Sequence, residues 1–102
     1  DWDDFRRLAL ELEGASESSH MGHPDFRVGG KIFATLNAGE TLGMVKLSNE
    51  EQLHFVEKSP EIFSPCAGAW GHRGATHVNL AIVDEPTLKN CLELAWRKFV
   101  KK

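Results

Sequence analysis

Apolar side chains recur at helical spacing at the start of the chain. Within residues 1–14 they fall at three- and four-residue intervals, as an amphipathic helix requires: Trp2, Phe5, Leu8, Ala9 and Leu12. Acidic residues open this segment and Gly14 closes it, and these residue types favour a helix N-terminus and a left-handed C-terminal position. We therefore predict a helix that packs one apolar stripe against the rest of the protein.

The pattern then changes to the two-residue period of strands. A glycine pair at 29–30 separates residues 26–28 from residues 31–36, and such a pair suits a two-residue hairpin loop because both loop residues need positive φ. The simple register for this loop places Phe26 opposite Phe33 on one face of the sheet. The other face is then expected to carry Arg27, Ile32 and Ala34.

A third strand and a central helix are expected next. A turn at residues 37–39 leads into residues 41–47, where apolar residues form a partly buried strand and Gly43 suggests a bulge. Ser48 and Glu51 have the spacing of a capping box, in which each side chain satisfies a backbone donor of the other residue. We therefore predict a helix that begins beside Ser48.

The last forty residues predict two more strands and a final helix. Residues 61–74 hold one proline and three glycines, which indicates a short edge strand followed by a loop. Residues 76–83 alternate as a strand that turns Ile82 toward the core. Asp84 is expected to cap the final helix, which has a basic end: Lys98, Lys101 and Lys102.

These elements predict an α+β fold, a two-layer α/β sandwich in which N-terminal, central and C-terminal helices pack on an antiparallel sheet. With 102 residues and no linker or repeat, the chain is expected to form one domain over residues 1–102. Its 41% apolar and 26% charged residues are typical of a folded protein. Short apolar runs predict neither a signal peptide nor a membrane helix, and hence a cytoplasmic protein. Cys66 and Cys91 lie far apart without a C-x-x-C pair, so they are expected to be reduced thiols. We also expect a monomer without a cofactor.

Candidate catalytic and metal-binding groups are sparse. His20 and His23, with Glu17 nearby, could bind zinc or iron only if a turn brings the two rings together, because residues three apart on a strand face opposite ways. Cys66 with His72 or His77 could form a thiol and base, but nothing supplies a third member. We therefore predict a non-catalytic protein without a metal site.

A group of cations and one aromatic residue suggests a binding surface. Cations beside an exposed indole can neutralise phosphate while a base stacks on the ring, although the same side chains also occur on ordinary solvated faces. The net charge of −3 gives no long-range attraction for nucleic acid, so such a surface would have to be local. The candidate residues are Arg27, Lys31, Lys46, Trp70, His72 and Arg73.

The order of these motifs resembles the MmcQ/YjbR family of small bacterial proteins over nearly the whole chain. The most specific match is the hairpin pattern F-x-V-x-G-K-x-F-A-x-L, which runs here from Phe26 to Leu36 and is followed by Lys46 and Trp70. The resemblance implies a two-layer fold with an antiparallel sheet, similar to frataxin (CyaY-like) and secretion-chaperone architectures. It also implies DNA binding through two hairpin-like wings, at 29–30 and at 70–75.

Within those wings, the matching positions are Lys31, Lys46, Trp70 and Arg73. The chain departs from the family pattern at Glu13, where a proline is common, and at Ala75, where an aromatic residue is common. The resulting hypothesis is weak DNA binding through the wings. The alternative is a protein- or peptide-binding, chaperone-like module that uses a sheet edge or a groove beside Trp70.

Overall fold

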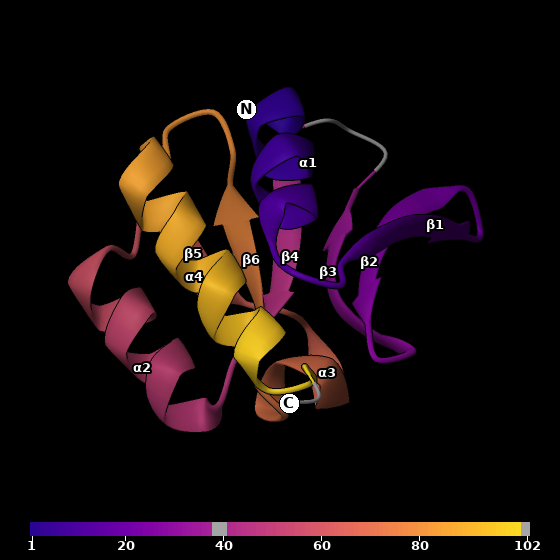
Figure 1. The fold of residues 1–102 in the computed structure, drawn as a ribbon. Coiled ribbons are helices and arrows are strands. Elements are labelled where there is room, and N and C mark those ends of the chain that lie inside the picture. Colours follow the sequence, from indigo (N-terminus) through magenta and orange to yellow (C-terminus); the bar gives the residue numbers. More distant parts are fainter. Residues whose placement is uncertain (38–40, 101–102) are drawn as a thin grey trace.

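Helices cover one face of an antiparallel sheet in a computed structural model of the protein, which describes residues 1–37 and 41–100 (Figure 1). Six strands lie in the order β1-β2-β3-β4-β6-β5, and every neighbouring pair is antiparallel. The elements in chain order are α1 (Trp2–Glu11), β1 (Ser16–His20), β2 (His23–Val28), β3 (Lys31–Leu36), β4 (Leu42–Lys46), α2 (Asn49–Lys58), β5 (Phe63–Pro65), α3 (Gly68–His72), β6 (Ala75–Asn79) and α4 (Glu85–Arg97). The expected α+β architecture is confirmed.

The core lies between the sheet and the helices α1, α2 and α4 (Figure 1). Helix α4 buries the four side chains of its apolar stripe, and α1 buries Phe5, Leu8 and Ala9. Burying a Leu or Phe side chain contributes roughly 1.5–3 kcal/mol relative to leaving it in water. The two terminal amphipathic helices therefore supply much of the apolar area that holds the sheet. None of the helices in the described ranges is long and apolar enough to cross a membrane.

Gly43 allows α1 to approach the sheet closely. A Cβ atom at this position would lie 2.5 Å from Cε2 of Phe5, whose ring is fully buried. Gly43 pairs with Leu36 and Val78 without a shift in register, so the expected bulge at Gly43 is wrong. The glycine is needed for side-chain packing instead.

The bulge of this sheet lies in the β2–β3 hairpin. Val28 pairs with Lys31 around the glycine loop as expected, but the register shifts at Phe26, which lies opposite Ala34. The expected pairing of Phe26 with Phe33 is therefore wrong, as is the placement of Ala34 on the other face. One extra residue on β3 lets Phe33 and Ala34 both be fully buried against the helices.

The segment from β5 to β6 is more structured than expected. The edge strand β5 is confirmed, but the following loop contains the five-residue helix α3. Strand β6 begins at Ala75 and ends at Asn79, so Ile82 lies beyond it and is 51% exposed. The expectation that Ile82 faces the core is wrong because the chain turns after Asn79.

Helix ends follow the sequence signals closely. Ser48 Oγ accepts from the Glu51 amide at 3.1 Å, and Glu51 Oε1 accepts from the Ser48 amide at 2.8 Å, which confirms the capping box of α2. Asp84 occupies the N-cap position of α4, without a side-chain hydrogen bond to the helix backbone. The expected turn at residues 38–39 and the basic end at 101–102 lie outside the described residues.

Candidate ligand-binding groove on the open face of the sheet

The sheet face opposite α1 and α4 is largely polar, and we call it the open face. Strand alternation buries Leu36, Val45 and Val78 beneath the helices and turns their neighbours to the open face. Across the strands, Thr35 lies opposite Met44, and Met44 lies opposite His77. This row forms the centre of the open face.

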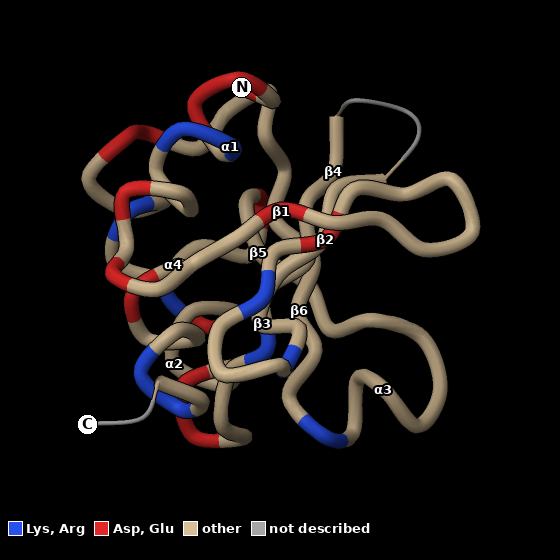
Figure 2. The backbone as a smooth tube through the Cα atoms, turned by 45° about the vertical axis from the view of Figure 1, so that its right-hand side comes forward, with Lys and Arg blue, Asp and Glu red and all other residues tan. Residues whose placement is uncertain are grey.

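Two projecting segments turn the open face into a groove. Figure 2 shows the tip of the β1–β2 hairpin and the α3 segment standing out on the same side of the molecule. The groove has a volume of about 450 Å³. The residues that line it and carry the argument below are His20, Met21, Thr35, Lys46, Trp70 and His77.

Helix α3 is held in place by contacts from α2. The side-chain amide of Gln52 donates to the carbonyl oxygens of Gly71 and Ala75, each at 3.0 Å, and reaches Thr76 Oγ1 at 3.2 Å. Glycine is required at position 71 because a Cβ atom there would collide with the backbone carbonyl of Cys66. These contacts fix the wall that carries Trp70.

Lys46 and Trp70 meet at the rim of the groove. Lys46 Nζ lies 5.3 Å from the centroid of the Trp70 ring, within the range of a cation–π contact, and the indole is 61% exposed. Burial, and next the charge of nearby Lys31, lowers the pKa of Lys46. Two of the expected binding residues, Lys46 and Trp70, therefore meet at the groove, whereas Lys31 is exposed at the start of β3 and does not line it.

Arg27 is committed to a different contact. Its Nε and a terminal guanidinium nitrogen donate to the two carboxylate oxygens of Asp25 at 2.8 and 3.1 Å. His20 Nδ1 lies 2.8 Å from Asp25 Oδ2, and Asp25 has no exposed surface. The hydrogen bonds from Arg27 in particular hold the pKa of Asp25 below its ordinary value, so this carboxylate is ionised and neutralised by its neighbours.

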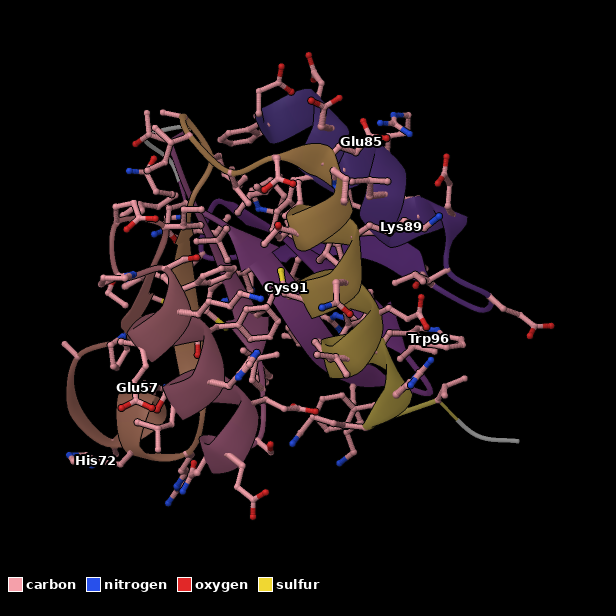
Figure 3. The ribbon with its side chains drawn as sticks, turned by 90° about the vertical axis from the view of Figure 1, so that its left-hand side faces the viewer. Glu57, His72, Glu85, Lys89, Cys91 and Trp96 are labelled. Carbon is pink, nitrogen blue, oxygen red and sulfur yellow. The ribbon has the colours of Figure 1, made fainter. Side chains whose placement is uncertain are left out.

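The remaining expected binding residues lie outside the groove. His72 lines a separate hollow between α2 and α3, and Figure 3 shows its imidazole pointing outward from α3. Arg73 is exposed directly after α3. The sequence grouping is therefore divided in space, with Arg27 held by Asp25 and His72 facing another surface.

The histidine pair at the hairpin tip is not arranged as a metal site. Met21 and Gly22, both with positive φ, form a turn that places His20 opposite His23, with ring centroids 6.4 Å apart. The nearby Glu17 carboxylate instead accepts two hydrogen bonds from Arg6. Within residues 1–37 and 41–100, no three His, Cys, Asp or Glu side chains are placed to hold a metal ion.

Cys66 has the wrong environment for a nucleophile. It lies half-buried between β5 and α3, and burial raises the pKa of its thiol. A nucleophilic cysteine needs the opposite shift, toward thiolate near neutral pH.

Thr35 and His77, at the floor of the groove, were missed by the search for cations and aromatic residues. Strand alternation contains part of the signal, because Thr35 lies between the buried Ala34 and Leu36, and His77 lies between the buried Thr76 and Val78. The bulge at Phe33 hides this signal in β3, since Phe33 is buried two positions before Thr35. Asp25 could have been connected to Arg27 in the same way, since residues two apart on a strand share a face.

Two comparisons place this fold among known proteins. The YjbR family model matches residues 10–98. The crystal structure of Deinococcus radiodurans protein DR2400, with the family-model domain DUF419, is similar with a TM-score of 0.81 at 19% identity, covering 98% of this chain and 78% of that chain. None of the curated proteins compared with the chain matches it. Since the family model covers most of the sequence, the chain belongs to the YjbR family.

Proposed function

We propose that this domain binds nucleic acid without catalysing a reaction on it. Lys46 and Lys31 meet phosphates, and a base stacks on Trp70. The observation that carries the proposal is the ammonium group of Lys46 held 5.3 Å from the centroid of a largely exposed indole. Base stacking on an aromatic side chain contributes roughly 1–3 kcal/mol.

The distribution of charge supports this surface within an acidic protein. The tip of the β1–β2 hairpin and α3 contain no Asp or Glu, whereas acidic residues mark the helices α1, α2 and α4 (Figure 2). Arg73 adds a cation at the end of α3. With three cations the interaction is weak and short-ranged, and a single strand contacting all three should show a salt slope of about −2, at about 0.7 per phosphate contact.

Titration of a fluorescently labelled single-stranded DNA, followed by anisotropy at several salt concentrations, tests the proposal. We expect Trp70→Ala to weaken binding by roughly 1–3 kcal/mol, and Lys46→Gln to weaken binding and make the salt slope shallower by about 0.7. Lys89→Gln, on the outer surface of α4 (Figure 3), is the matched control and should bind as wild type. A flat titration at low salt refutes the proposal.

An exposed sheet edge favours a second candidate, peptide binding. β1 is one of the two edge strands of the sheet, and all five of its residues are exposed. An extended peptide could add to this edge through main-chain hydrogen bonds. A partner captured from lysate that survives nuclease treatment and is lost on Ser19→Pro would favour this candidate over nucleic acid. Ser19 lies opposite Pro24 in a pair without hydrogen bonds, so its backbone N–H faces the open edge, and proline removes that donor.

A further inference from the structure

The groove is depleted of negative charge in an acidic protein. The chain has 15 Asp and Glu against 12 Lys and Arg, yet none of the described residues that line the groove is acidic. Lys46 lines it, together with the imidazoles of His20 and His77. Asp25 lies behind His20, where Arg27 neutralises it. The groove is therefore complementary in charge to an anion.

Its shape suits a small molecule with a flat apolar part. The volume of about 450 Å³ falls within the roughly 300–1,000 Å³ typical of small-molecule sites. Trp70 and Met21, 61% and 93% exposed, stand at its walls, whereas Thr35 at its floor is 9% exposed. A ligand that enters between these walls would lose water from one apolar face and meet polar groups at its edge.

One polar group near the floor has unused hydrogen-bonding capacity. Nδ1 of His77 is buried and has no partner among the residues described. Buried nitrogens without a partner are uncommon in folded proteins. A turn of the imidazole would present this nitrogen to a ligand in the groove, with Met44 between it and Thr35.

We infer that the groove takes one phosphorylated nucleoside at a time, with its base against Trp70, its phosphate at Lys46 and its base edge toward Thr35 and His77. The inference deepens the proposed function and rests on it in using the same lysine and indole. The shared chemistry is a planar heterocycle that carries phosphate. Its source is either a free mononucleotide or the phosphorylated end of a strand.

Nuclear magnetic resonance titration of the whole protein with adenosine monophosphate tests the inference. We expect shifts at the amides of Thr35, Lys46 and His77 and at the Trp70 indole, with millimolar affinity. Adenosine lacks the phosphate and ribose 5-phosphate lacks the base, so each should bind at least about tenfold more weakly than adenosine monophosphate. Shifts restricted to the helical face, or no shifts at about 10 mM ligand, overturn the inference.

A variant that fills the groove tests whether the mononucleotide binds inside the groove or only at its rim. Ala67 is exposed at the N-cap of α3 and lines the groove, whereas Ala69 is exposed within α3 and does not line it. Ala67→Phe should weaken binding of the mononucleotide at least about tenfold and leave the salt slope of strand binding unchanged. Ala69→Phe is the matched control and should bind the mononucleotide as wild type.

Competition distinguishes this inference from the proposed function. If a strand binds and the mononucleotide does not, the groove inference is wrong and the proposed function stands. If the mononucleotide binds in the groove and no strand binds, the proposed function is wrong and a free nucleotide is the ligand. If a strand with a 5′-phosphate competes with the mononucleotide and an unphosphorylated strand does not, the strand end is the ligand.

Discussion

Asp25 is a charged residue whose burial is compensated entirely by its neighbours. It has no exposed surface, and its carboxylate receives two hydrogen bonds from Arg27 and faces His20 Nδ1. A buried carboxylate without such partners would be strongly destabilising. The same pairing keeps negative charge away from the groove beside it, so one contact serves both stability and charge complementarity.

We expect Asp25→Asn to destabilise the fold by about 1–3 kcal/mol at neutral pH, because Arg27 would lose its ionised acceptor. The pKa of Asp25 is lowered from 3.8 in the folded state. Its contribution is therefore complete above that value and is lost as the pH falls through the folded-state pKa. Urea denaturation of both proteins between pH 7 and pH 2 should show the difference shrinking as the pH falls.

The exposed ion pair between Arg6 in α1 and Glu17 in β1 supplies the control. Glu17 and Arg6 also form two hydrogen bonds, but both side chains remain about one-third exposed. Glu17→Gln should therefore change the free energy of unfolding by less than about 1 kcal/mol. Equal losses for Asp25→Asn and Glu17→Gln would contradict the special role of burial at Asp25.

Among the elements, α3 depends most on contacts from elsewhere in the chain. It has only five residues, and no side chain caps its N-terminus. Isolated helices of this length are not stable in water. Its conformation therefore follows from the hydrogen bonds of Gln52 and from Gly71, which lets it pack on the backbone of Cys66.

Gln52→Leu should release α3, because the carbonyls of Gly71 and Ala75 would lose a shared donor. We expect a loss of about 1–3 kcal/mol in stability and faster hydrogen exchange at the Gly74 amide, which donates to Gly71. Gln52→Glu has nearly the same shape but no donor, so it should be at least as damaging. If the Gly74 amide exchanged at the wild-type rate in both variants, α3 would form without this contact.

Strong local signals made most elements predictable, and the exceptions depend on contacts distant in sequence. The capping box of α2 and the glycine loop of the β2–β3 hairpin are local, so they were predicted correctly. The bulge beside Phe26 depends on how β3 fits under the helices, and the close approach at Gly43 depends on Phe5. Neither can be deduced from the local pattern.

The same distinction applies to the candidate site. Lys46 and Trp70 were grouped from the sequence by residue type, and the fold brings them together across β4 and α3. Arg27 was grouped with them on the same grounds, although Asp25 two positions earlier occupies it. A cation that can pair with a carboxylate two residues away on the same strand face should therefore be left out when cations are assigned to a binding surface.

At the scale of the whole molecule, the first and last helices, α1 and α4, pack together on one face of the sheet. Trp96 Nε1 in α4 donates to the Glu13 carbonyl at 2.8 Å, and Arg7 in α1 pairs with Glu85 at 2.8 Å. The ion pair is exposed and contributes little. The apolar stripes of α1 and α4 carry the attachment, and both helices leave the open face of the sheet uncovered.

Cys91 reports on the unfolding of this core as a unit. It is fully buried in α4 as part of the core (Figure 3), and burial raises the pKa of its thiol to about 12. At pH 8 only about one thiol in ten thousand would be ionised, and iodoacetamide reacts with the thiolate. We expect Cys91 to be alkylated only across the global urea transition and Cys66, half-buried beside α3, to react earlier. Mass spectrometry of the two peptides measures both rates, and equal rates in native buffer would mean that α4 opens without global unfolding.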